Sequence, residues 1–309
     1  MSALSQAAEE YLALRRSLGH QLADHHRLLP RFVAYLDQAG AHTITVEAAL
    51  AWAQQPEATP GSTVWARRLT VACGFARHMA GIDPQTEIPP AGAIGYRQRR
   101  RPPFIFGDTD VAAVMARAGS IRWPLPAASH ETLIGLLAAT GMRVGEAIRL
   151  DRDDVDWAEG VLLIRRSKFT KSRQVALHAS AVDALRCYAD RRDELMPRPV
   201  TPAFFVSIRG TRLIYQVVHE VFGNCCRAAG VGAGAAVTPR IHDLRHSFAV
   251  RCLLAWYQEG ADVQARLPLL SAYLGHRDPR STYWYLSAAP ELLAYAAQFL
   301  DALGMENAP

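Results

Sequence analysis

Hydrophobic and polar positions alternate with helical spacing over the first 90 residues. One apolar run ends at Gly19 and a second ends at Gly40. Thr45 introduces an alanine-rich third run, and residues 62–79 form a fourth. Apolar side chains at this spacing predict amphipathic helices, and the glycines are typical helix stops. We therefore predict a helical domain over residues 1–90, built as a compact bundle of four or five helices.

A short segment at residues 91–103 differs in composition. Pro102 and Pro103 end it, and the stretch YRQRRR places four arginines in six residues. Prolines stop helices and favour extended chain, so we predict a linker. A solvated connector alone does not need four arginines. A linker that lies along a chain of phosphates would use them.

The pattern from residue 104 to 290 predicts a second domain that is mainly helical. Asp108 or Thr109 is placed to cap a helix, and Thr140-Gly141 ends a later one. The two best strand candidates, residues 160–165 and 173–177, flank a basic turn and predict a β-hairpin. The predicted fold class is therefore mainly α with a small antiparallel β-hairpin or sheet. The tail, residues 291–309, has the pattern of an amphipathic helix.

The composition narrows the class of protein. Of 309 residues, half are hydrophobic and a fifth are charged, which is ordinary for a globular chain, and the net charge of +5 suits a polyanionic partner. The five cysteines are odd in number and contain no CxxC pair, which argues against a disulfide framework. The sequence has no signal-peptide pattern and no apolar run of about 20 residues. We expect a soluble cytoplasmic protein with no membrane partner.

The first candidate for chemistry is Arg143, in the stretch TGMRVGEA. It follows a glycine turn at the predicted start of a helix, where backbone N–H groups favour an anion. The alternative is a surface arginine that pairs with Glu146 in the first helical turn. Taken alone, this alternative is the stronger interpretation.

The second candidate is the stretch IHDLRH, in which His242, Arg245 and His246 share one helical face. Two imidazoles and a guanidinium are costly to bury without an anion, and a phosphate would supply one. One alternative is a pair of core histidines beside a structural arginine. Another is a zinc site of the HExxH type with His276 as third ligand, but Asp243 replaces the general base and Arg245 would repel the metal.

The third candidate is LGH at residues 274–276, followed nine residues later by Tyr285 in the stretch STYWYL. Aromatic residues on a helix usually pack in a core, and Tyr283 lies only two residues away. The meaning of Tyr285 therefore depends on the two earlier segments.

Together, an arginine, HxxR, LGH and a tyrosine nine residues later resemble the tyrosine recombinase (phage integrase) family, over residues 104 to 290. The resemblance implies a helical, SAM-like core-binding domain that clamps DNA and an α+β catalytic domain. It implies that Lys168, in the hairpin turn, is the general acid, with Lys171 as its rival. Glu146 and His246 would support the site. The remaining catalytic residues that it implies are Arg143, His242, Arg245, His276 and the nucleophile Tyr285.

The same resemblance implies an activity. Tyr285 would attack a DNA phosphate and form a 3′-phosphotyrosyl bond, and the site would use no ATP, metal or other cofactor. The function would be site-specific recombination of the integrase or transposase type, by four protomers on double-stranded DNA in the bacterial nucleoid. The ending YWYLSAAPELL looks like recombinases of multi-recombinase mobile elements, which would act beside sister recombinases. DNA contacts are predicted for Arg67, Arg68, Arg97, Arg99, Arg100, Arg101, Lys171 and Arg173.

Two other functions stay open at this level. A type IB topoisomerase uses a similar site to relax supercoils, and an accessory protein would bind DNA without cutting it. The full set of catalytic residues argues against the accessory protein. The tail helix has two interpretations as well: packing on its own domain, or docking into a neighbouring protomer to regulate the presentation of Tyr285.

Overall fold

The computed structural model describes residues 2–20, 22–56, 63–90, 92–94, 102–165, 172–276, 278 and 282–283. The chain divides into two compact units, Met1–Arg100 and Arg101–Pro309. The boundary falls inside the predicted linker. In the described part of the chain, no helix has both the length and the apolar character needed to cross a bilayer.

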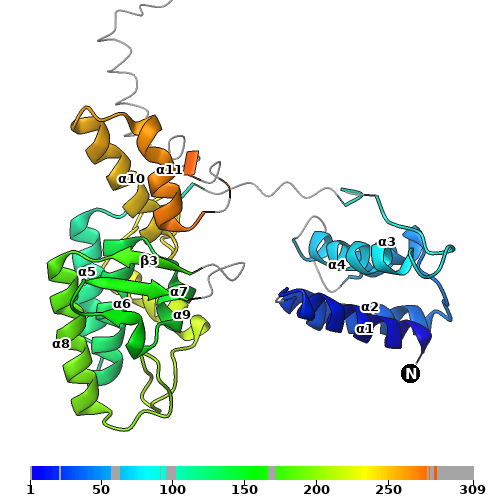
Figure 1. Cartoon of the computed structure of the whole chain (residues 1–309), viewed down its shortest axis with the longest axis horizontal. Helices are drawn as coiled ribbons and strands as arrows, with labels where there is room; N and C mark the ends of the chain where they lie inside the picture. Colours follow the sequence, from blue (N-terminus) through cyan, green and yellow to red (C-terminus); the bar gives the residue numbers. More distant parts are fainter. Residues whose placement is uncertain are drawn as a thin grey trace, which may run out of the picture. The chain divides into compact units, whose positions relative to one another are not determined.

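Unit 1 contains four described helices (Figure 1). Their buried side chains form one hydrophobic core. Thr45 caps the third, because its side chain accepts a hydrogen bond from the backbone N–H of Ala48 at 3.1 Å, as the sequence predicts. Phe32 and Trp52 pack together in the core with ring centroids 4.8 Å apart. The helices are α1 (Ala3–Ser17), α2 (Ala23–Gln38), α3 (Val46–Ala53) and α4 (Thr63–Met79).

Unit 2 combines helices with a three-stranded antiparallel sheet in the order β1-β2-β3. The predicted hairpin is confirmed, with Leu162 opposite Val175 and Ile164 opposite Arg173. The two-residue strand β1 was not predicted. The elements are α5 (Asp108–Gly119), α6 (Pro124–Thr140), α7 (Val144–Arg149), a 3₁₀ turn η1 (Arg152–Asp154), β1 (Val155–Asp156), β2 (Val161–Ile164), β3 (Arg173–Ala176), α8 (Ala179–Leu195), α9 (Tyr215–Ala228), α10 (Asp243–Gln258) and α11 (Val263–Leu274).

The start of unit 2 is tied to the element that carries the HxxR segment. The Phe106 backbone N–H donates to Ser247 Oγ at 2.8 Å, and this hydroxyl donates to the Asp243 carbonyl at 2.8 Å. The predicted cap of α5 needs correction. The helix begins at Asp108 with Gly107 as N-cap, and the Gly107 N–H is satisfied by the Asp110 carboxylate at 3.0 Å. The fold class, mainly α with a small antiparallel sheet, is confirmed.

Candidate active site

Arg143 stands between the end of α6 and the start of α7. Gly141 ends α6 with φ of +60°, a left-handed conformation that suits glycine. Arg143 then caps α7, where its backbone N–H and its Nη1 donate to the Glu146 carboxylate at 3.0 and 2.9 Å. Its Nη2 donates to the Gly275 carbonyl at 3.0 Å. Pairing with Glu146 therefore occurs, yet the Arg143 side chain stays 32% exposed and can still meet a ligand.

Arg245 lies in the first turn of α10 and is only 2% exposed. Its Nη1 donates to the Gly141 carbonyl at 2.8 Å, and its Nη2 donates to the Leu274 carbonyl at 2.7 Å. These carbonyls end α6 and α11, and the C-terminal end of a helix carries partial negative charge that favours a cation. Arg143 and Arg245 thus bind the carbonyls of two adjacent residues, which brings their guanidiniums to the same end of α11.

Glu146 is the buried carboxylate of this region. It accepts the hydrogen bonds of Arg143 and also two from Arg173, whose Nη1 and Nη2 donate at 3.0 and 2.8 Å. Burial raises the pKa of Glu146, but the bonds from Arg173 and the Arg143 N–H, with the two positive charges, outweigh it and lower the pKa to about 2. One carboxylate against two guanidiniums leaves this network with a net positive charge.

His242 and His246 lie one helical turn apart at the start of α10. Their rings meet edge to face, with centroids 4.9 Å apart. The residue His242 is exposed to solvent, but crowding of its ring by protein atoms and the Arg245 charge lower its pKa to about 4. Burial and the neighbouring His242 lower the pKa of His246 to about 3. Both imidazoles are therefore neutral at pH 7.

His276 directly follows the left-handed Gly275, whose φ is +67°. The backbone N–H of His276 donates to the Ser271 carbonyl at 2.9 Å, which closes the end of α11. Its Nδ1 lies 2.7 Å from Oγ1 of Thr282, a residue that is 1% exposed. Burial and the charges of Arg245 and Arg143 lower the pKa of His276 to about 3, so it too is neutral at pH 7.

The structure therefore brings Arg143, Arg245 and His276 to the end of α11, although Arg143 lies more than a hundred residues before the other two in the sequence. Electrostatic coupling of His242 with His276 and both arginines places His242 in the same group. Tyr283 is 51% exposed. The predicted residues that lie outside the described part of the chain are Arg97, Arg99, Arg100, Arg101, Lys168, Lys171 and Tyr285.

Two of the residues predicted to contact DNA are largely buried. Arg68 is 6% exposed, donates to the Gln55 carbonyl at 3.3 Å, and lies 6.0 Å from the Trp52 ring centroid, so it belongs to the core of unit 1. The Arg173 side chain is 13% exposed and is occupied by Glu146 and by the Tyr273 carbonyl, which its Nε reaches at 2.9 Å. Both side chains are thus bound within the protein. Arg67 differs, with its side chain 52% exposed and Asp24 at 3.5 Å.

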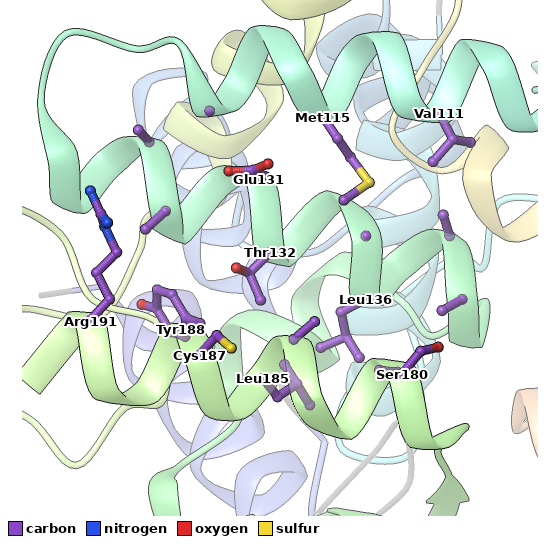
Figure 2. A pocket seen from close by; sticks show the side chains of 18 of the residues that line it. Val111, Met115, Glu131, Thr132, Leu136, Ser180, Leu185, Cys187, Tyr188 and Arg191 are labelled. Carbon is purple, nitrogen blue, oxygen red and sulfur yellow. The ribbon is translucent and has the colours of Figure 1, made fainter.

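A cavity of about 700 Å³ lies apart from these residues, between α5, α6 and α8. Figure 2 shows Met115 of α5, Glu131 of α6 and Cys187 of α8 on its walls. None of the predicted site residues is among the described residues that line this cavity. Within the described ranges, no three histidine, cysteine, aspartate or glutamate side chains are arranged to hold a metal ion.

Comparison with known proteins places the chain in a family. Residues 118–291 match the model of the phage integrase family. The Sinorhizobium fredii protein y4rB, named as an integrase/recombinase, is 39% identical over 97% of this chain and 98% of its own. The tyrosine recombinase XerD of Mycobacterium leprae is 30% identical over 89% of each chain.

The fold is similar to solved structures as well. The integrase of the transposon Tn1549, solved in complex with transposon right end DNA, has a TM-score of 0.65 at 15% identity, over 96% of this chain and 99% of that chain. The match to the family model covers more than half of this sequence, and y4rB aligns over nearly all of it. The chain belongs to the phage integrase family.

Proposed function

We propose that this protein is a site-specific DNA recombinase that cuts and rejoins strands through a covalent bond between Tyr285 and a phosphate. The observation that carries the proposal is the pair Arg143 and Arg245, bound to the adjacent carbonyls of Gly275 and Leu274. Two fixed guanidiniums beside neutral imidazoles form a site for one anion that accepts hydrogen bonds from both arginines. A phosphodiester is such an anion, and its non-bridging oxygens gain negative charge during the reaction.

The arginines would stabilise the charge that develops during cleavage. When a phenolate attacks the phosphorus, the transition state gathers negative charge on the non-bridging oxygens. A guanidinium can hold such oxygens through charge-assisted hydrogen bonds, and one that is already fixed needs no reorganisation. Arg245 is fixed by Gly141 and Leu274, and Arg143 is fixed by Glu146 and Gly275.

The histidines and the lysine of the site would transfer the protons. His242 and His276, neutral at pH 7, can accept the phenol proton of Tyr285 or hydrogen-bond to the phosphate. The Oη–P bond forms as the P–O5′ bond breaks, and Lys168 gives its proton to the departing 5′ oxygen. Attack by a 5′ hydroxyl on the phosphotyrosine reverses these steps and releases Tyr285. The ester keeps the bond energy, so the reaction would need no ATP. The two arginines would stabilise the charge that a metal ion stabilises in other phosphoryl transfers, so it would need no metal cofactor.

The same chemistry sets the number of protomers. Exchange of two DNA duplexes breaks four strands, and each chain has one nucleophile. We therefore propose a tetramer on double-stranded DNA, with exchange through a Holliday junction in the bacterial nucleoid. Sister recombinases would occupy some positions of that tetramer if the protein belongs to a multi-recombinase element.

A suicide substrate tests the proposal. Purified protein is mixed in EDTA with nicked DNA from the ends of its own element, and the products are separated on a denaturing gel. The nick lets the 5′ fragment diffuse away, so a covalent complex accumulates. We expect a shifted protein–DNA band that Tyr285→Phe abolishes. Tyr283→Phe is the matched control, because Tyr283 lies two residues away, and this variant keeps the band.

Three other results would contradict the proposal. A band lost in Tyr283→Phe and kept in Tyr285→Phe would move the nucleophile. DNA binding without any covalent band on native ends would make the protein an accessory subunit. Relaxation of supercoiled plasmid without a special site would instead indicate a topoisomerase.

A further inference from the structure

The end of α11 presents the carbonyls of three consecutive residues to three arginines. The arginines come from three different elements. Arg143 is the N-cap of α7, Arg173 is the first residue of β3, and Arg245 lies in α10. The three donor–acceptor distances lie between 2.7 and 3.0 Å. The pairs are Tyr273 with Arg173, Leu274 with Arg245, and Gly275 with Arg143.

All three guanidinium nitrogens of Arg173 have partners within the protein. Nε donates to Tyr273, and Nη1 and Nη2 donate to the two carboxylate oxygens of Glu146. The side chain is 13% exposed. These bonds use three of the five N–H groups of the guanidinium and hold its plane against Glu146 and Tyr273.

The bonds of Arg173 connect the parts that hold Arg143. Glu146 holds Arg143 from one side, and the end of α11 holds it from the other through Gly275. Arg173 binds both of these partners, so it closes a ring of contacts among α7, β3 and α11. Its guanidinium also packs directly against Gly275, where an added Cβ would lie 2.8 Å from Nη1.

We propose that Arg173 is a positioning residue of the recombination site, which fixes Glu146 against the end of α11 so that Arg143 faces the scissile phosphate. The inference rests on the proposed function. It replaces the DNA contact predicted for Arg173 by a role inside the protein. A lysine cannot substitute fully, because one ammonium group does not reproduce the planar fork that reaches the carboxylate and the carbonyl together.

Arg173→Gln and Arg173→Lys test this role in the full-length protein. We expect Arg173→Gln to slow covalent complex formation roughly 10- to 100-fold, the effect of a misplaced catalytic group, and Arg173→Lys to fall between it and the wild type. Arg212→Lys is the matched control. Arg212 also binds one carboxylate and two carbonyls, those of Asp151, Ile148 and Leu150, but touches no catalytic residue. The Arg212→Lys variant should cleave at the wild-type rate.

A second substrate separates positioning from general structural support. A methylphosphonate at the scissile position lacks one charged non-bridging oxygen, so its cleavage depends less on Arg143. If Arg173 acts by holding Arg143, the loss in Arg173→Gln shrinks on this substrate. Equal slowing on both substrates, or a wild-type rate on the normal one, would overturn the inference.

A third readout does not depend on recombination. In protein labelled with ¹⁵N-arginine, the two Nη signals of Arg143, assigned with Arg143→Lys, should be resolved because its bonds hinder rotation. We expect them to merge in Arg173→Gln and to stay resolved in Arg212→Lys. If the wild type forms no covalent complex, the proposed function fails. The Nη signals would still show whether Arg173 holds the Arg143 guanidinium in place. Signals that stay resolved in Arg173→Gln would refute the role of Arg173.

Discussion

In unit 2, Arg143 and Arg245 are each held by two protein partners, and Arg245 is almost fully buried. In unit 1, Arg67 lies half-exposed on α4 with a single carboxylate, Asp24, at 3.5 Å. A guanidinium that is fixed before the substrate arrives defines the place of one phosphate and stabilises a change in its charge. A mobile, exposed one attracts any phosphate along a backbone. We therefore propose that the same side chain serves chemistry in unit 2 and general DNA affinity in unit 1.

Arg245→Lys should produce the largest change. The compact ammonium group of lysine does not reproduce the planar fork by which Arg245 reaches the carbonyls of Gly141 and Leu274, so its placement beside the phosphate and the transition-state stabilisation are lost. We expect covalent complex formation to slow roughly 10²- to 10³-fold, as when an oxyanion donor is removed. Rapid-quench kinetics on the suicide substrate would measure this rate.

Arg251→Lys is the control on the same helix. Arg251 binds Asp108 and the Ala138 carbonyl, away from the site, so this variant should stay within a few-fold of the wild type. A lysine at position 245 that cleaves at nearly the normal rate would remove Arg245 from the proposed mechanism.

Gly275→Ala should have the next largest effect. At φ of +67° an alanine is strained, and its Cβ would also lie 2.8 Å from the Arg173 guanidinium, which three bonds hold in place. We expect a loss of about 2–3 kcal/mol in the free energy of unfolding, with slower cleavage. Urea denaturation followed by circular dichroism would measure the stability.

Gly260→Ala measures the backbone strain of a left-handed alanine without a steric contact of its Cβ. Gly260 has the same φ of +67°, at the end of α10, but no atom lies within 4 Å of the added Cβ. It should cost about 1–2 kcal/mol and leave cleavage unchanged. Equal effects of the two substitutions would show that Arg173 moves aside freely, and this would weaken its positioning role.

The features that sequence predicted correctly are local. Thr45 caps α3, Gly141 ends α6, and alternating residues form the β2–β3 hairpin, because each depends on neighbours along the chain. The burial of Arg68 was not predicted, although helical spacing offered a sign: Val71 and Ala72, three and four residues later on the same face of α4, are buried core residues. Adjacent helical residues point about 100° apart, so Arg67 and Arg68 need not share a face.

The features that sequence did not predict depend on distant contacts. Arg245 binds the carbonyl of a residue 104 positions earlier, and Arg173 binds Glu146 across 27 positions. No local pattern reports which carbonyl ends beside which guanidinium, since tertiary packing decides it. The residue types of the motifs predicted the chemistry, and the fold decides which arginines are fixed and which are exposed.

A smaller effect should appear in the dependence on pH. The pKa values of His242 and His276 lie near 4 and 3 in the folded protein, below the ordinary value of 6.5. Between these values the unfolded chain binds more protons, so stability falls as the pH drops from 7 toward 4. A bound phosphate would raise both pKa values, because it offsets the arginine charges.

We therefore expect DNA binding to take up protons at pH 5.5. Calorimetry in two buffers of different ionisation enthalpy measures the number of protons. His276→Asn should reduce it, whereas His178→Asn, at an exposed position, should not. Proton release on binding would contradict the placement of a phosphate beside these imidazoles.

The smallest expected effect separates the two neighbouring arginines of unit 1. Arg67→Ala removes an exposed charge, so DNA affinity should fall about equally on all sequences, and the slope of log K against log salt should decrease by about 1. Arg68→Ala removes a buried group that binds the Gln55 carbonyl beside Trp52, so the thermal stability of the protein should fall while the salt slope stays unchanged. Filter binding between 50 and 200 mM salt, with melting curves of both variants, measures the difference. A reduced slope in Arg68→Ala at full stability would return Arg68 to the DNA surface, and the contrast between fixed and exposed arginines would then no longer hold within unit 1.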